Sequence, residues 1–143
     1  MFQLDPVLAA DTIYLGDFPL CALLMSKDAN YPWFILVPRC DDIQEIFQLD
    51  QQQRAALMQE SCVLAQVPQR IFDADKLNVA ALGNVVPQLH LHHIVRHHND
   101  PAWPAPIWGA VAPLTYEEKA LQDRLDLVLS SLAQEQFSVS GEA

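Results

Sequence analysis

Basic side chains, cysteine and long apolar runs are all scarce in this chain of 143 residues. Lysine and arginine together number eight, against 18 aspartates and glutamates, so the net charge is −10. A surface this acidic repels polynucleotides and anionic lipids, so the sequence predicts no nucleic-acid polymer and no membrane as a partner. No apolar run is long enough to span a bilayer, and the sequence therefore predicts no transmembrane segment either.

The three cysteines, Cys21, Cys40 and Cys62, are odd in number and widely spaced. This pattern favours reduced thiols in a cytoplasm over a disulfide framework. The N-terminus Met-Phe-Gln-Leu-Asp-Pro lacks the basic region and the long apolar core of a signal peptide, which also predicts a cytoplasmic protein. No Gly/Ser-rich linker and no internal repeat divides the chain, so residues 1–143 are predicted to form a single domain.

Alternating or continuous apolar runs predict five β-strands. These runs cover residues 11–17, 20–26, 33–39, 76–83 and 88–95. Asp50-Gln51-Gln52-Gln53 resembles a helix capping box and predicts the start of the main helix. This helix is expected to kink or end near residues 64–67, because Pro68 lacks a backbone donor and clashes with the preceding turn.

A second capping box, Thr115-Tyr116-Glu117-Glu118, predicts a C-terminal helix over about residues 116–133. Residues from Gln134 onward are expected to be frayed. The predicted fold class is therefore α+β, with an antiparallel sheet of about five strands, one main helix and a C-terminal helix. Its core is expected to extend from about residue 10 to residue 112.

All five histidines lie within nine residues, between His90 and His98. Alternation predicts a strand here, with side chains at i and i+2 on one face about 7 Å apart. The polar face would carry Gln88, His90 and His92. The apolar underside would carry Leu89, Leu91, His93 and Val95. A half-buried strand normally exposes Thr, Ser or Lys, so a row of two imidazoles and a carboxamide indicates chemistry.

Three interpretations of this row compete. It is a solvated, histidine-rich strand face, or a metal site, or a site for nucleophilic catalysis at phosphorus. His-x-His on a strand can chelate zinc, but the sequence offers no Cys-x-x-Cys and no His-Glu-x-x-His to complete a ligand set. We therefore expect no metal and no cofactor.

The stretch Gln88-Leu89-His90-Leu91-His92-His93-Ile94 resembles the histidine triad (HIT) motif His-φ-His-φ-His-φ-φ, where φ is apolar. His90 matches the middle histidine, which is the nucleophile in that family, and His92 matches the third. Gln88 stands in place of the first histidine, and His93 occupies a φ position. Two further segments support the resemblance. Gly83-Asn84-Val85-Val86 resembles Gly-Gln-Ser/Thr-Val, and residues 31–39 resemble Pro-Gly-His-x-Leu-φ-φ-Pro-x.

These supporting segments carry two more departures. Val85 lacks the hydroxyl that helps to hold the phosphate in that family. Trp33 replaces a histidine, and we expect its ring to fill the sheet face rather than to stack on a base.

The resemblance implies a nucleotide hydrolase or nucleotidyl transferase. It would act at the α-phosphate of a nucleoside phosphoramidate or dinucleoside polyphosphate, through a covalent nucleotidyl-His90 intermediate. His92 would donate a hydrogen bond to a phosphate oxygen or to the leaving group, and Gln88 could donate but not titrate. The alternative is a catalytically weakened nucleotide-binding protein of the same fold, as the departures Gln88 and Val85 indicate.

Substrate-binding candidates flank the triad. Arg96 shares the parity of His90 and His92, which favours a phosphate contact, with an ion pair to Asp100 as the alternative. Asn84 would donate to a phosphate oxygen or serve as a turn residue. The ligand expected is a small-molecule nucleotide. Members of the HIT family commonly pair two sheets across a two-fold axis, so the resemblance also predicts a homodimer.

Three expectations concern the remaining histidines and the tryptophans that follow. His93 is expected to be a core histidine bonded to backbone, and His97 and His98 to be solvated in a loop. Trp103 and Trp108 are expected to pack over the pocket or a subunit seam.

Overall fold

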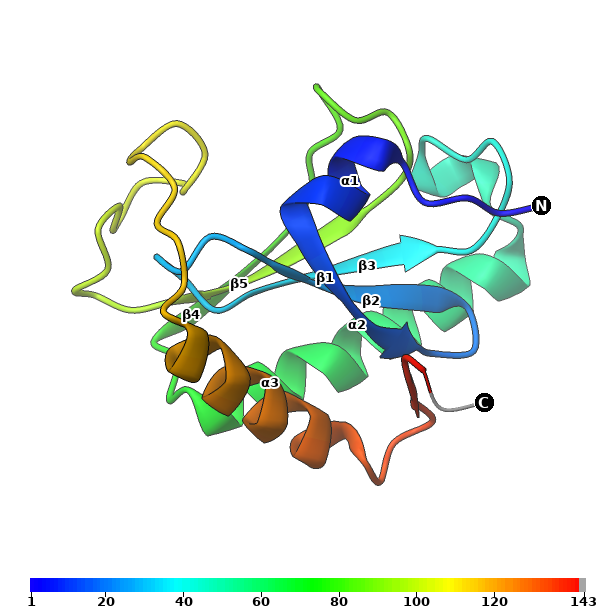
Figure 1. The fold of residues 1–143 in the computed structure, drawn as a ribbon. Helices are drawn as coiled ribbons and strands as arrows, with labels where there is room; N and C mark the ends of the chain where they lie inside the picture. Colours follow the sequence, from blue (N-terminus) through cyan, green and yellow to red (C-terminus); the bar gives the residue numbers. More distant parts are fainter. Residues whose placement is uncertain (142–143) are drawn as a thin grey trace.

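The apolar and alternating runs form one antiparallel sheet in the computed structural model, which describes residues 1–141 (Figure 1). Within residues 1–141 the sheet has six strands, one more than predicted, in the order β4-β5-β3-β2-β1-β6. The strands are β1 (Thr12–Asp17), β2 (Cys21–Ser26), β3 (Trp33–Pro38), β4 (Lys76–Ala81), β5 (Leu91–Arg96) and β6 (Ser138–Val139). With three α-helices added, this confirms the α+β fold class.

The helices lie on both faces of the sheet (Figure 1). They are α1 (Pro6–Asp11), the main helix α2 (Gln51–Ile71) and α3 (Glu118–Leu132), with a short 3₁₀ turn at Ile46–Gln48. The predicted capping box at Asp50 is formed, since its carboxylate accepts from the backbone N–H of Gln53 and the Gln53 side chain accepts in return. Among the described residues, no helix is both long and apolar enough to cross a membrane.

Alternate residues of the strands enter two different cores. On one face the strand residues Leu23 and Leu36 pack with Leu64 of α2 and Val128 of α3. On the opposite face Leu24, Ile35 and Val37 pack with Leu8 of α1 in a smaller cluster. The short helix α1 covers only part of that second face.

Helix α2 continues beyond its predicted end. It runs to Ile71 with Pro68 inside it, so an end at residues 64–67, one of the two outcomes predicted, was wrong. Proline removes one helical hydrogen bond, but Val67 and Pro68 are buried, and Phe72 stacks on Phe34 of β3 with ring centroids 6.3 Å apart. Packing against the sheet therefore holds the last turn in place.

The C-terminal segment is paired rather than frayed. Ser138 and Val139 pair with Asp17 and Gly16 to form β6, which corrects the expectation for residues from Gln134 onward; residues 142–143 lie outside the described part. Phe137 anchors this strand on Phe18, with ring centroids 5.1 Å apart. Gly16 is required for the approach, because a Cβ at this position would lie 2.1 Å from the Ser138 carbonyl oxygen.

The second predicted capping box does not form. Thr115 makes a β-bridge with Asp28, and α3 begins two residues later than predicted, after Glu117, whose side chain makes no capping hydrogen bond. The helix itself, Glu118–Leu132, lies within the range predicted from the sequence.

The triad strand is shorter than the alternation predicted. The ladder between β3 and β5 ends at the pair Leu36–Leu91, and the backbone N–H of Leu89 bonds to the Ile43 carbonyl in a loop. Gln88 therefore lies at a bend before the strand and not on its face. All six residues of β5 are buried, because β4 and β3 flank the strand and both of its faces are covered.

Candidate active site

A cavity of about 270 Å³ lies where α1, the sheet and the segment entering β5 meet. Its walls are mainly apolar, and α1 supplies Val7 and Leu8 to one of them. His90 and His92 line it together, as the shared strand face predicted. An apolar pocket with a few convergent polar groups is typical of a small-molecule site.

His90 is held in one tautomer by the main chain. Its Nδ1 lies 2.7 Å from the carbonyl oxygen of Gln88, and the ring is only 5% exposed. A carbonyl oxygen only accepts hydrogen bonds, so Nδ1 carries the proton in this contact. The neutral ring then has its lone pair on Nε2, the form in which an imidazole is a nucleophile.

His92 is held in the opposite tautomer by a tryptophan. The indole Nε1–H of Trp33 donates to His92 Nδ1 at 2.9 Å. Because an indole nitrogen only donates, His92 Nδ1 is unprotonated and the ring carries its proton on Nε2. The rings of His90 and His92 lie edge to face with centroids 4.8 Å apart. The cavity thus presents one imidazole lone pair beside one imidazole N–H.

Burial keeps His92 neutral. Loss of solvent lowers the pKa of His92 to about 4, and the neighbouring His90 acts in the same direction. Burial likewise lowers the pKa of His93 to about 4. At neutral pH His92 is therefore a hydrogen-bond donor without a positive charge.

The Gln88 side chain is not part of the cavity lining. Its Oε1 accepts from the backbone N–H of Asp5 at 2.9 Å, and its Nε2 donates to the Gln3 carbonyl at 2.8 Å. The predicted row of Gln88, His90 and His92 is thus incomplete, because the chain bends at Gln88. What Gln88 contributes near the histidines is its main-chain carbonyl.

Asn84 and Val85 both line the cavity, at the loop that leads into β5. Val85 is 85% exposed, so an apolar side chain stands at the open side where the family has a hydroxyl. Asn84 is likewise exposed and places a carboxamide at the same side.

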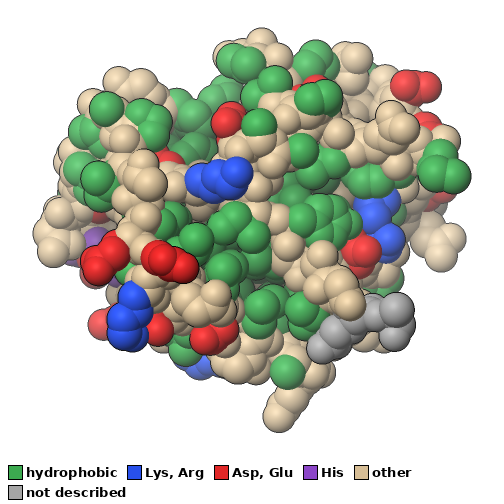
Figure 2. Space-filling view, viewed as in Figure 1, with side chains coloured by type: hydrophobic (Ala, Val, Ile, Leu, Met, Phe, Trp, Pro, Cys, Tyr) green, Lys and Arg blue, Asp and Glu red, His purple; other side chains and the backbone are tan. Residues whose placement is uncertain are grey.

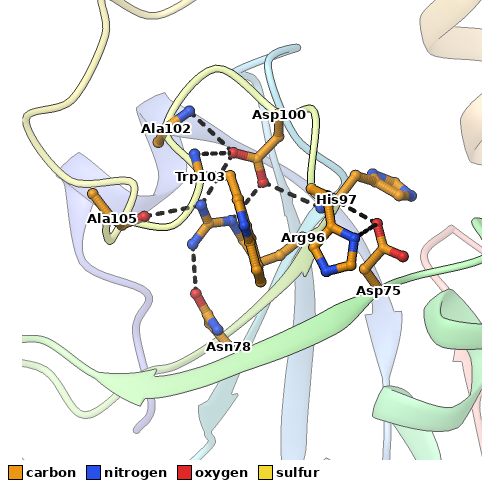
Figure 3. Close-up of polar contacts among 9 residues, drawn as sticks. Asp75, Asn78, Arg96, His97, Asp100, Ala102, Trp103 and Ala105 are labelled. Carbon is orange, nitrogen blue, oxygen red and sulfur yellow. Dashed lines mark hydrogen bonds and ion pairs between the residues drawn. The ribbon is translucent and has the colours of Figure 1, made fainter.

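Arg96 does not line the cavity, although it shares the parity of His92. Figure 3 shows its polar contacts. Its guanidinium is 1% exposed and binds both carboxylate oxygens of Asp100, at 2.7 and 3.1 Å. It also donates to Asn78 Oδ1 at 2.7 Å and to the Ala105 carbonyl at 2.9 Å. The ion pair with Asp100 is therefore formed, and no donor of Arg96 faces the cavity for the predicted phosphate contact.

Asp100 organises the loop that follows β5 (Figure 3). Its carboxylate accepts from the backbone N–H groups of His97, Ala102 and Trp103. Burial alone would raise the pKa of this carboxyl, but the hydrogen bonds from Arg96 and the backbone outweigh it and lower the pKa to about 2.

The loop held by Asp100 carries Trp103 and Trp108, which were predicted to pack over the pocket or a subunit seam. Trp108 lines the cavity and packs on His92, with ring centroids 5.1 Å apart. Trp103 instead lies 5.5 Å from the Arg96 guanidinium and outside the cavity lining. Only Trp108 therefore covers the site.

The other histidines have structural contacts. His93 is fully buried, with Nε2 2.7 Å from Ser61 Oγ and Nδ1 3.1 Å from the Leu91 carbonyl, as expected of a core histidine. His98 is exposed beside Asp75, as predicted for a solvated loop. His97 differs from that prediction, because it is half-buried with Nε2 2.9 Å from the Phe72 carbonyl.

Two features of the site escaped the sequence analysis. The Trp33–His92 hydrogen bond was missed, because Trp33 was expected only to fill the sheet face. The signal available was that Trp33 replaces a histidine of the HIT pattern, which marks a position near the site. The contribution of α1 was missed because nothing in residues 6–11 signals a ligand. No group of three or more His, Cys, Asp or Glu side chains is arranged to hold a metal ion within residues 1–141.

The buried histidines predict a stability that depends on pH. Their folded-state pKa of about 4 lies below the unfolded value of 6.5, so protons bind the unfolded chain more readily. Stability is therefore lost as pH falls from 6.5 towards 4, by roughly 2 kcal/mol for each of His92 and His93 at pH 5. Urea unfolding at pH 7, 6 and 5, with NMR titration of both rings, measures this. Rings that titrate above pH 6 would contradict it.

The Arg96–Asp100 pair predicts a second effect on stability. Asp100→Asn leaves a buried guanidinium without its counter-charge and is expected to lower the unfolding free energy by about 3–5 kcal/mol. Lys119–Asp123 offers a matched control, since it has the same i,i+4 spacing and the same 2.7 Å contact but is exposed. Asp123→Asn should have a much smaller effect, because solvent screens exposed pairs. Equal urea midpoints for the two variants would refute this difference.

Comparisons with known proteins agree with this geometry. Residues 8–99 match the family model of the HIT domain. A histidine triad protein from Marinobacter aquaeolei is 48% identical, with a TM-score of 0.90 over 94% of this chain and 98% of its own. A histidine triad protein from Bradyrhizobium japonicum is 45% identical, with a TM-score of 0.89 over 91% of this chain and 97% of its own.

A more distant structure shows the same fold. The diadenosine triphosphate hydrolase of Plasmodium falciparum is 12% identical, with a TM-score of 0.59 over 88% of this chain and 87% of its own. No curated protein sequence matches this chain. The family match covers well over half of the chain, and the two bacterial proteins are close in both sequence and structure. The chain belongs to the HIT family.

Proposed function

We propose that this protein is a nucleotide hydrolase or nucleotidyl transferase that acts at an α-phosphate with His90 as the nucleophile. The observation that carries the proposal is the pairing of two oppositely held tautomers in one cavity. His90 is held with its proton on Nδ1 and its lone pair on Nε2, and His92 is held with its proton on Nε2. The substrate proposed is a nucleoside phosphoramidate or a dinucleoside polyphosphate. The fold shared with a diadenosine triphosphate hydrolase supports this choice.

The reaction proceeds in two displacements. His90 Nε2 attacks the α-phosphorus, a P–N bond forms, and the bond from phosphorus to the leaving group breaks. The nucleotidylated ring carries a positive charge, so its Nδ1–H bond to the Gln88 carbonyl becomes charge-assisted and stronger. Water then attacks phosphorus, the P–N bond breaks, and its electron pair returns to His90 Nε2. In a transferase, another acceptor takes the place of water.

The surrounding residues hold the substrate. His92 donates from Nε2 to a non-bridging oxygen as negative charge develops in the transition state. Asn84 lies at the open side of the cavity and is proposed to donate to a phosphate oxygen. Arg96 is proposed to act at a distance, because its ion pair with Asp100 holds the loop that carries Trp108 over the site.

The second candidate is a nucleotide-binding protein with weakened catalysis. Val85 favours it, because an apolar side chain at the open side cannot replace a hydroxyl donor to phosphate. A burst of released leaving group from a fluorescent adenylate, equal to the amount of protein, separates the two functions. An enzyme with a covalent intermediate shows the burst, and a binding protein does not.

Alanine substitutions test the assigned roles. His90→Ala should abolish turnover and leave nucleotide binding largely intact, because His92 and Asn84 remain. His92→Ala should slow turnover by about 10²–10³-fold, through loss of one donor to the developing charge. His98→Ala is the matched control, since this histidine is exposed and lies outside the cavity lining.

The covalent step is tested by intact-protein mass. The protein is mixed with a nucleoside phosphoramidate or a dinucleoside polyphosphate, quenched, and then digested to map the adduct. A nucleotidyl group on His90, absent from His90→Ala, is the expected result. Unchanged turnover in His90→Ala would exclude the mechanism.

We also propose that the protein is a homodimer. β4 lies at an edge of the sheet with its backbone open to a further strand, and Val79 on this strand is 50% exposed. Leu114 is 56% exposed, and Figure 2 shows further hydrophobic side chains exposed between charged ones on one face. Light scattering at micromolar concentration should give twice the chain mass of 16.1 kDa. A mass of 16.1 kDa would contradict the dimer.

A further inference from the structure

The residue in the first triad position uses its side chain away from the histidines. Gln88 Oε1 accepts from the Asp5 backbone N–H at 2.9 Å, and Gln88 Nε2 donates to the Gln3 carbonyl at 2.8 Å. Both ends of one carboxamide are therefore bound to the main chain of one segment, 83 and 85 residues away in sequence.

That segment leads directly into a wall of the cavity. Helix α1 begins at Pro6 and supplies Val7, Leu8 and Asp11 to the lining. Leu8 is 6% exposed and belongs to the smaller core on this face of the sheet. The position of residues 3–5 therefore contributes to where this wall stands, beside the packing of Leu8 and the hydrogen bonds from Lys27 to Ala10 and Asp11.

Helix α1 cannot hold itself in place. It has six residues, fewer than a helix needs to be stable in water without tertiary contacts. The ion pair between the N-terminus and Asp41 lies at the exposed surface, where such pairs contribute little. The two hydrogen bonds of Gln88 tie the segment just before α1 to the chain that leads into β5.

Gln88 also holds the proposed nucleophile, through its main chain. Its carbonyl oxygen lies 2.7 Å from His90 Nδ1 and fixes the tautomer of that ring. We propose that Gln88 is a positioning residue that links the cavity wall to the nucleophile. Its side chain clamps residues 3–5, its carbonyl orients His90, and the distance between wall and nucleophile is thereby set by a single residue.

A histidine at position 88 cannot form the same clamp. A carboxamide presents its acceptor and its donor side by side, as required by a backbone N–H and a carbonyl two residues apart in one segment. The two nitrogens of an imidazole point away from each other, so the ring reaches one of these partners at most. The glutamine therefore adds a function to this site, while its main-chain carbonyl is available in any residue type.

The matched pair Asp5→Pro and Asp5→Ala isolates the clamp without altering Gln88. Proline removes the N–H that Gln88 Oε1 accepts, and the Asp5 φ of −53° suits proline. Both variants lose the carboxylate that caps α1 at Val7, so they differ in the backbone donor. Gln88→Ala removes both hydrogen bonds and leaves the main-chain carbonyl in place.

Amide hydrogen exchange of residues 7–11 measures how firmly the Gln88 hydrogen bonds hold helix α1, and the experiment requires no substrate. Loss of one hydrogen bond should speed exchange about fivefold in Asp5→Pro relative to Asp5→Ala, and Gln88→Ala should show a larger increase. The double variant Gln88→Ala/Asp5→Pro should exchange no faster than Gln88→Ala/Asp5→Ala, because the bond is already absent. Equal exchange in Asp5→Pro and Asp5→Ala overturns the clamp, whether or not Gln88→Ala folds.

Steady-state kinetics with diadenosine triphosphate test the link to the site, and this arm rests on the proposed function. We expect KM to rise about fivefold in Asp5→Pro relative to Asp5→Ala, with a smaller change in kcat, because the wall moves while His90 keeps its tautomer. Faster exchange with an unchanged KM overturns the positioning role. If the unaltered protein neither cleaves diadenosine triphosphate nor binds AMP, the proposed function fails, and the exchange experiment still decides the clamp.

Discussion

Strand β5 is buried on both faces and yet carries three polar side chains, and the rest of the structure follows from this constraint. A polar group removed from water must find a partner inside the protein or destabilise the fold. The partners come from three different elements: Trp33 of β3 for His92, Ser61 of α2 for His93, and Asp100 of the following loop for Arg96. The bonds that satisfy this strand therefore also attach the sheet, the main helix and the Trp108 loop to one another. One of these attachments, the bond between Trp33 and His92, lies in the wall of the cavity.

The same bonds set the chemistry of the two cavity histidines. A carbonyl can only accept and an indole nitrogen can only donate, so His90 and His92 are held in opposite tautomers. Neither partner titrates near neutral pH, and burial lowers the pKa of His92 to about 4. His92 therefore keeps its tautomer over the pH range in which an imidazole would otherwise change its charge. Trp33 matters here because a histidine in its place could both donate and accept, and would leave the tautomer of His92 undetermined.

Parity along the chain predicted which histidines share a face, and the structure agrees for His90 and His92 in the cavity and His93 in the core. Parity does not reveal what covers a face. Arg96 lies on the His92 side, but the loop from residue 97 to 108 closes over it and supplies Asp100. Long-range contacts produced the other differences: β6 pairs with a strand more than 120 residues earlier, and packing of Phe72 carries α2 past Pro68. The hydrogen bonds from Gln88 to residues 3 and 5 are also long-range contacts. They could not be predicted from the sequence, because both partners are main-chain atoms, which every residue type has.

The departures Gln88 and Val85 leave both imidazoles, His90 and His92, in the cavity. The tautomer of His90 depends on the carbonyl of residue 88, which is present in every residue type, so this position can change its side chain and keep His90 oriented. Val85 stands at the open side of the cavity in place of the Ser or Thr of the HIT pattern, so the hydroxyl that would help to bind a phosphate is missing there. The retained residues, His90 and His92, are the two that the proposed displacement uses directly. Burial alone does not indicate this chemistry, because His93 is buried in the core and its pKa is also lowered to about 4. What distinguishes His90 and His92 is that both line the cavity and are held in opposite tautomers.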